Sequence, residues 1–185
     1  MKLLLHICCA PCSIMCIETL RGEGIEPVGF WDNPNIHPFT EFRMRRNTLV
    51  DYAKEIGLSL VVEGGYGLRP FLEAVGGDFD GRCPVCYRLR MRSAARYAAE
   101  NGFTHFTTTL LISPYQNHEL LAQTAHEAAE EFGVSFLYRD FRPSFREGQD
   151  RARAMGLYMQ KYCGCIFSEE DRYRKRKKPP KKEEA

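Results

Sequence analysis

The sequence lacks any long hydrophobic run. No stretch approaches the roughly 20 apolar residues that a membrane-spanning helix requires, and His6 interrupts the N-terminal apolar run before it reaches the roughly 7 residues of a secretory leader. Glycine and proline account for only 15 and 10 of the 185 residues, which excludes collagen-like and low-complexity proteins. We therefore expect a cytoplasmic protein that has no contact with a membrane.

Apolar residues are plentiful enough for one packed core, since they make up 44% of the chain. Positive charge gathers at the C-terminal end. Residues 172–185 contain eight lysines and arginines against two glutamates, although the whole chain carries a net charge of only +2. We expect a single domain over residues 1–171 and a disordered basic tail over residues 172–185. Such a tail suits either an RNA partner, through counterion release, or a purely solubilising role.

The apolar pattern predicts alternating strands and helices. Short apolar segments predict five strands, at residues 2–7, 25–31, 58–62, 105–108 and 135–137. Segments of helical periodicity lie between or after them, at residues 14–20, 39–56, 84–99, 117–132 and 145–157, and the glycine-rich residues 63–81 are expected to form loops. This order predicts an α/β fold with a doubly wound, mainly parallel five-stranded sheet, whose ligands bind at the carboxyl ends of the strands.

Eight cysteines in a chain expected to occupy a reducing compartment favour a metal or redox site over structural disulfides. Seven of them fall on three segments that follow a predicted strand or helix or open a helix: Cys8, Cys9 and Cys12; Cys83 and Cys86; Cys163 and Cys165. We expect these cysteine-rich segments to meet at the carboxyl-end rim of the sheet. Cys16 lies among apolar residues of the first predicted helix and is interpreted as a small buried residue.

The Cys-Pro-Val-Cys segment at residues 83–86 opens a helix, where free N–H groups and the helix dipole favour thiolates. Together with Cys8 and Cys9 it would provide four thiolates, which suit a structural zinc site or a [4Fe-4S] cluster. Structural zinc would leave Cys12 and the pair at 163 and 165 without a role, so the surplus of thiols suggests reactivity. Cys163 and Cys165, separated by one glycine, could form a reversible disulfide or add two metal ligands.

Other polar residues are expected near the same rim. Residues 107–118 cross from a strand into a helix, so Tyr115, Gln116 and His118 should face the site, where His118 either donates a proton or simply packs. Asp140 and Arg142 follow the fifth strand and form an ion pair, or act as an oxygen ligand and a substrate clamp.

Two arginines, Arg88 and Arg92, lie one turn apart on the helix predicted over residues 84–99. They could bind the phosphates of a nucleic acid or simply form a solvated helix face. Together with the basic tail, they favour an RNA partner.

Five segments carry the most distinctive residues: HICCAPCS at 6–13, NPNI at 33–36, RCPVCY at 82–87, TTTLLISPYQNH at 107–118 and GLYMQKYCGC at 156–165. In this order the chain resembles the cobalamin-independent epoxyqueuosine reductases of the QueH type, over about residues 3–168. The resemblance implies a HUP-like fold and the reduction of epoxyqueuosine to queuosine at the wobble position of tRNAs with GUN anticodons, the last step of queuosine biosynthesis.

The resemblance also implies a set of site residues. A [4Fe-4S] cluster would be held by Cys8, Cys9, Cys83 and Cys86, and a redox-active pair would be formed by Cys163 and Cys165. A neighbouring iron is implied too, with Cys12 and Asp140 as candidate ligands. Beside this set, position in the predicted fold gives Arg88, Arg92, Tyr115, Gln116 and Arg142 as candidate substrate-binding residues.

Converting an epoxide to an alkene releases its oxygen as water and consumes two electrons and two protons, whereas hydride delivery alone would leave an alcohol. We therefore expect electron transfer from a metal site, with iron polarising the epoxide oxygen and His118 or a water supplying protons. The Cys163–Cys165 dithiol could supply the electron pair, and an electron donor that the sequence does not identify would restore it.

Two other functions compete with this interpretation. A tRNA sulfur-transfer enzyme of the ATP-pyrophosphatase type needs a glycine-rich loop after the first strand, and residues 8–13 place cysteines there instead. A non-catalytic, zinc-stapled RNA-binding module would explain the thiols and the basic tail, but it would purify as a colourless protein.

Overall fold

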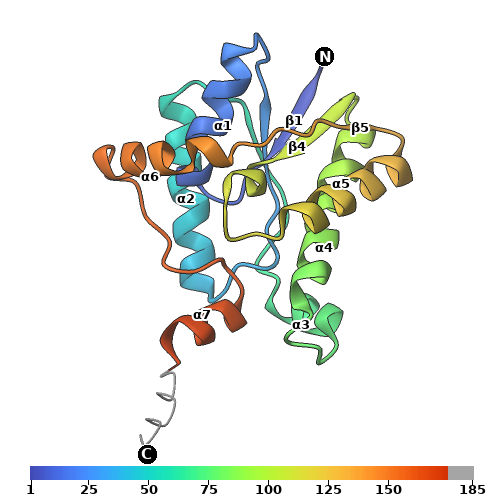
Figure 1. Ribbon diagram of the computed structural model, residues 1–185, viewed down its shortest axis with the longest axis vertical. Helices are drawn as coiled ribbons and strands as arrows, with labels where there is room; N and C mark the ends of the chain where they lie inside the picture. Colours follow the sequence, from blue (N-terminus) through green and yellow to red (C-terminus); the bar gives the residue numbers. More distant parts are fainter. Residues whose placement is uncertain (175–185) are drawn as a thin grey trace, which may run out of the picture.

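The computed structural model describes residues 1–174. Its centre is one sheet of five parallel strands in the order β3-β2-β1-β4-β5 (Figure 1). The strands are β1 (Leu3–His6), β2 (Val28–Trp31), β3 (Leu60–Val62), β4 (His105–Thr108) and β5 (Ser135–Phe136). The first strand of the chain is therefore the central strand of the sheet, which confirms the doubly wound, parallel α/β fold.

Helices cover both faces of the sheet. The helices α1 (Ala10–Gly22), α2 (Phe39–Glu55) and α6 (Phe145–Ala154) lie on one face, and α4 (Arg82–Glu100) and α5 (His118–Phe132) lie on the other (Figure 1). Two short helices, α3 (Leu68–Val75) and α7 (Ile166–Tyr173), lie beyond the end of the sheet. Single 3-10 turns occupy Thr109–Ile112 and Arg142–Ser144.

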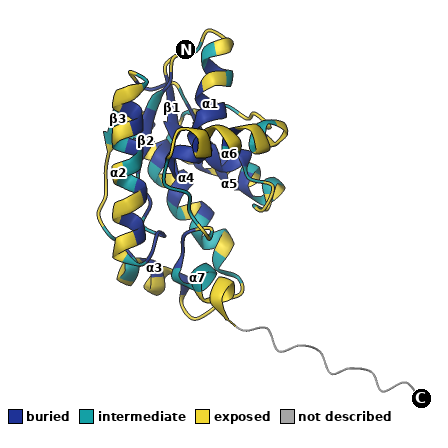
Figure 2. Cartoon of the chain, turned by 90° about the vertical axis from the view of Figure 1, so that its left-hand side faces the viewer, coloured by how far each residue is buried: buried dark blue, intermediate teal, exposed yellow. Residues whose placement is uncertain are grey.

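The core lies between these layers, where the strands and the inward faces of the helices are buried (Figure 2). Leu4 and Leu5 on β1 have no exposed surface, and burial of each side chain contributes about 1.5–3 kcal/mol to stability. Leu5 pairs with Gly29 on β2. A Cβ atom at Gly29 would lie 2.9 Å from Leu60, so only glycine allows the strands and their side chains to pack this closely.

The structure adds two helices that the sequence pattern did not predict. Helix α3 lies within the glycine-rich residues 63–81 and ends at Gly76, whose φ of +62° suits glycine. Helix α7 follows Cys165 and continues to Tyr173, so Arg172, which we assigned to the basic tail, is helical. The rest of the expected tail, residues 175–185, lies outside the described residues.

None of the helices formed by residues 1–174 combines the length and apolar character needed to cross a membrane.

Candidate active site

Three cysteines converge where β1 meets α1. Cys8 and Cys9 follow β1 directly, and Cys12 lies in the first turn of α1. Their Sγ atoms all lie within 4.8 Å of one another, and those of Cys8 and Cys9 are 3.7 Å apart. Because a tetrahedral site with metal–sulfur bonds of about 2.3 Å has sulfurs about 3.8 Å apart, the spacing of Cys8 and Cys9 suits ligands of one metal ion. We call these three residues the cysteine triad.

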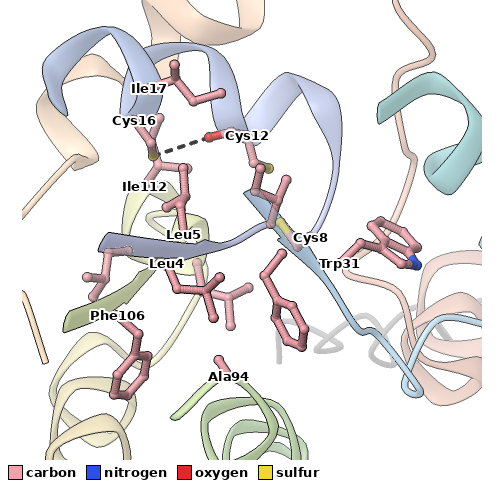
Figure 3. Packing of buried hydrophobic residues seen from close by; sticks show 14 of the residues in the cluster. Leu4, Leu5, Cys8, Cys12, Cys16, Ile17, Trp31, Ala94, Phe106 and Ile112 are labelled. Atoms are coloured by element: carbon pink, nitrogen blue, oxygen red, sulfur yellow. Dashed lines mark hydrogen bonds between the residues drawn. The ribbon is translucent and has the colours of Figure 1, made fainter. Parts of the chain in front are cut away.

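The triad is almost completely buried, with exposures of 8%, 1% and 7% for Cys8, Cys9 and Cys12. Figure 3 shows Cys8 and Cys12 at the edge of the apolar core, with Cys16 one turn further along α1. The thiol of Cys16 bonds to the backbone and not to a triad sulfur, since it donates a hydrogen bond of 3.3 Å to the carbonyl oxygen of Cys12. Cys16 is therefore a core residue, as its apolar neighbours in the sequence indicate.

The three thiols do not ionise alike. Hydrogen bonds from Cys12 and Cys9 hold the pKa of the Cys8 thiol well below its usual value. Burial raises the pKa of Cys9, and hydrogen bonds to Cys8 and Cys9 raise that of Cys12. The hydroxyl of Thr109 lies 3.4 Å from the Cys8 sulfur and supports a thiolate there. The triad thus favours one negative charge, on Cys8.

A cavity of about 400 Å³ opens beside the triad. Cys8 and Cys12 line it from one side, and Cys163 lines it from the segment before α7. Two amide groups contact these sulfurs: Gln160 donates to Cys9 at 3.0 Å and approaches Cys12 at 3.5 Å, and Gln116 donates to Cys163 at 3.3 Å. Residues distant in the sequence therefore bring thiols to one cavity.

The other four cysteines lie near the first turn of α4 and the start of α7. Cys86 is half-buried and Cys83 is exposed on α4, while Cys165 precedes α7. Burial, with smaller contributions from Cys163 and Cys165, raises the pKa of Cys86 to about 12, so these thiols are electrostatic neighbours. All eight cysteines are free thiols in this structure.

The structure groups the cysteines differently from the set Cys8, Cys9, Cys83 and Cys86. Within residues 1–174, the triad is the only group of three or more histidine, cysteine or acidic side chains with ligand atoms this close together. Cys12 joins Cys8 and Cys9, while Cys83 and Cys86 lie outside the group. The donors still fit a metal centre, because the triad provides three buried sulfurs. The thiolates of a cluster bind separate irons, so they lie further apart than the ligands of a single ion.

Tyr115 and Gln116 reach the cavity, as expected for residues 107–118. Tyr115 is 84% exposed, and its ring packs edge-on against Phe145 at the cavity mouth. The side chain of Gln116 is held in place, because the hydroxyl of the buried Tyr87 donates a hydrogen bond of 2.7 Å to its amide oxygen. Lys161 and Arg172 add positive charge to the lining.

Other candidate residues lie away from the cavity lining. His118 bonds the hydroxyl of Tyr138 at 2.9 Å, and burial and the charge of Arg142 lower its pKa. Hydrogen bonds from Arg142 lower the pKa of Asp140 to about 2. These residues form a group of their own near β5.

The two arginines predicted to form a phosphate-binding face are placed on the outside of α4. Arg88 is exposed, and Arg92 forms an ion pair with Glu131 on α5. The structure does not bring either of them to the cysteine sulfurs.

Three contacts of the site were missing from the sequence interpretation. Arg45 on α2 donates to the carbonyl oxygens of Tyr162 and Cys163, Arg90 on α4 contacts Cys86, and Gln160 contacts the triad. The sequence could have indicated Gln160 as a site residue, because it lies three residues before Cys163. Arg45 and Arg90 could not be identified in this way, because no pattern in the sequence distinguishes them from arginines exposed to solvent.

The family model and the curated relatives that match this chain carry the same family name. The model of the family described as epoxyqueuosine reductase QueH matches residues 3–171. The chain is 36% identical over 178 residues to epoxyqueuosine reductase QueH of Dehalococcoides mccartyi, covering 96% of this chain and 98% of that protein. It is 33% identical over 175 residues to the protein of the same name from Thermotoga maritima, covering 89% and 88%.

A solved structure described as a predicted subunit of a tRNA methyltransferase from Methanocaldococcus jannaschii resembles the chain with a TM-score of 0.50 at 10% identity, covering 83% of this chain and 88% of that one. This likeness concerns the fold alone. The sequence relationships show more than the fold, because they establish that the chain belongs to the epoxyqueuosine reductase QueH family.

Proposed function

We propose that this chain reduces epoxyqueuosine to queuosine in tRNA at a metal centre built on the cysteine triad. The observation that carries the proposal is the arrangement, in a member of this family, of three buried sulfurs, two of which line one cavity together with the thiol of Cys163. A metal–thiolate centre supplies single electrons when it is bound. The surrounding side chains determine which substrate reaches it.

We infer that the metal is iron, as a [4Fe-4S] cluster with a neighbouring iron. Cys8, Cys9, Cys83 and Cys86 would hold the cluster, and Cys12 is the favoured ligand of the second iron. Asp140 is a weaker candidate for that iron, because its carboxylate is engaged by Arg142 and does not line the cavity. The thiol donors support this assignment because iron–sulfur clusters are held by cysteine thiolates.

Cys163 and Cys165 are proposed as the redox pair. When two thiols form a disulfide they release two electrons and two protons, which is what the loss of the epoxide oxygen as water consumes. The amide of Gln116 holds the Cys163 sulfur at the cavity. An external reductant must then convert the disulfide back to two thiols. His118 lies outside the lining, so it would donate a proton only through a water.

The cavity suits a nucleoside that has left the stack of an RNA loop. The exposed ring of Tyr115 at its mouth offers a surface on which a neighbouring base can stack, worth about 1–3 kcal/mol. Lys161 and Arg172 can bind phosphates beside it. Arg88 and Arg142 lie further out, where they would contact only the more distant backbone of the tRNA.

The proposal is tested by anaerobic incubation of the protein with tRNA that carries epoxyqueuosine and a strong reductant, followed by mass analysis of the nucleosides. We expect loss of one oxygen atom from the modified nucleoside. The same tRNA incubated with reductant alone is the control. A colourless, zinc-loaded protein that binds tRNA and leaves the oxygen in place would instead indicate the RNA-binding module.

A further inference from the structure

Arg90 is a buried cation between the two groups of cysteines. It lies on α4, one turn after Cys86, and only 2% of its surface is exposed. Its guanidinium donates to the side-chain oxygen of Asn33 at 2.7 Å and lies 4.0 Å from the Cys86 sulfur. Asn33 is fixed in turn, because it donates to the carbonyl oxygen of Ile7 at 2.9 Å.

No acidic side chain balances this charge. Within residues 1–174, Arg90 forms no ion pair with a carboxylate, and its Nε atom is buried without a hydrogen-bond partner. The nearby His6 adds no second positive charge, since burial and the charge of Arg90 lower its pKa to about 3 and it stays neutral. A buried charge that lacks a counter-charge is strongly destabilising.

The groups around Arg90 that can become negative are thiols. The Cys86 sulfur lies 4.0 Å from the guanidinium, and Asn33 links Arg90 to the carbonyl oxygen of Ile7, the residue before Cys8. Cys8 belongs to the triad and Cys86 opens α4, so one guanidinium connects two of the three cysteine segments.

We propose that Arg90 is the fixed positive charge that balances an anionic metal–thiolate centre and raises its reduction potential. The inference rests on the metal-binding part of the proposed function. One-electron reduction makes such a centre more negative without breaking or forming a bond. A nearby cation in a medium of low dielectric constant stabilises the reduced form more than the oxidised form, and N–H groups directed at sulfur act in the same sense.

The test compares reduction potentials of the anaerobically prepared metalloprotein. Arg90→Met removes the charge and leaves an apolar side chain that a buried site tolerates, whereas Arg90→Lys keeps the charge. Arg96→Met, on the exposed side of the same helix, is the matched control. The midpoint potential of each variant is measured by redox titration followed by absorption or electron paramagnetic resonance, and bound iron is counted.

We expect Arg90→Met to favour the oxidised centre at least tenfold, which for a one-electron couple is a shift of about 59 mV to more negative potential. Arg90→Lys should shift it less, and Arg96→Met should leave it unchanged. If Arg90→Met cannot retain iron while Arg90→Lys does, the iron count supports the same charge requirement. Iron content and potential equal to the parent protein in Arg90→Met would overturn the inference, as would a parent protein whose metal is not redox-active.

This outcome is separable from that of the proposed function. A protein whose metal centre shifts in potential as expected, but which leaves epoxyqueuosine unchanged, contradicts the proposed reaction and upholds the role of Arg90. A protein that removes the oxygen with the same potential in the parent and in Arg90→Met contradicts only the role of Arg90.

Discussion

Arg45 donates a hydrogen bond of 2.8 Å to the carbonyl oxygen of Cys163, a residue 118 positions later in the chain. A second bond, of 2.9 Å, reaches the carbonyl oxygen of Tyr162. The guanidinium is held by a buried ion pair of 2.6 Å with Glu41, one turn earlier on α2. Arg45 therefore ties the segment that carries the proposed redox pair to the body of the domain.

Replacing Arg45 with methionine leaves the carboxylate of Glu41 buried without its counter-charge. We expect Arg45→Met to lower the free energy of unfolding by about 3–5 kcal/mol. The control is Arg151→Met, which breaks two exposed pairs, one of the same spacing with Glu147 and one with Glu18, and should cost about 1 kcal/mol or less. Urea denaturation measures both, and similar losses in the two variants would contradict the structural role of Arg45.

Gly164 allows the turn between Cys163 and Cys165. Its φ is +153°, and a Cβ atom there would lie 3.3 Å from Ile36 and 3.4 Å from Arg45. We expect Gly164→Ala to cost roughly 1–3 kcal/mol and to speed the alkylation of Cys163 as the segment loosens. Gly65→Ala is the matched control, because its Cβ would meet nothing within 4 Å. Equal alkylation rates in both variants would show that the segment tolerates a side chain.

Gln160 supports the triad from the cavity side. Removal of its amide in Gln160→Ala takes away the hydrogen bonds to the sulfurs of Cys9 and Cys12. We expect metal affinity to fall by about 10- to 100-fold, as for other groups that orient metal ligands, measured by competition with a chelator. Gln123→Ala, which removes an exposed amide bonded to Glu127, should bind metal as the parent protein does.

Cys12 and Cys16 provide a comparison within one helix. Cys12→Ser removes the favoured ligand of the second iron, so we expect the protein to lose that iron and keep the cluster, because a hydroxyl is a poor ligand for soft metals. Cys16→Ser preserves a donor to the carbonyl oxygen of Cys12 and lies outside the triad, so metal content should be retained. Elemental analysis after anaerobic purification measures both. Equal metal loss in the two variants would indicate a folding defect instead of a ligand role.

The basic residues at the C-terminal end should strengthen tRNA binding through charge alone. Truncation after Arg174 removes six lysines and arginines and two glutamates. We expect weaker binding and a smaller dependence of the binding constant on salt concentration, since fewer counterions are released. Binding measured over a series of salt concentrations gives both quantities. An unchanged salt dependence would assign these residues a solubilising role.

The fold could be predicted from the sequence because its signals are local. Apolar segments mark the strands, and positions such as Cys8 and Cys9, immediately after β1, follow from the rule that parallel strands share one carboxyl-end edge. Helix α3 was missed because the glycines around it are typical of loops. The short Leu68–Val75 segment between them satisfies the helical pattern only over two turns.

The composition of the site was harder to predict because it depends on strand order. Asp140 and Arg142 follow β5, which is the edge strand and lies two strands from β1. At about 4.8 Å per strand, β5 lies about 10 Å from β1, and neither Asp140 nor Arg142 lines the cavity beside the triad. Arg90 looks like its exposed neighbours in the sequence, and only the positions of Asn33 and Cys86 in space explain its burial.

Gln160 and Cys163 belong to one stretch of the chain, residues 157–165, which has no helix or strand of its own. This stretch both covers the triad sulfurs and presents the thiol of Cys163 at the cavity. Cys163 is already exposed, whereas loosening of the attachment to Arg45 would admit dissolved oxygen to the buried triad sulfurs, and thiolates then progress to sulfenic and higher acids. We therefore expect the triad thiols to resist oxidation in air only as long as this segment stays bound to Arg45.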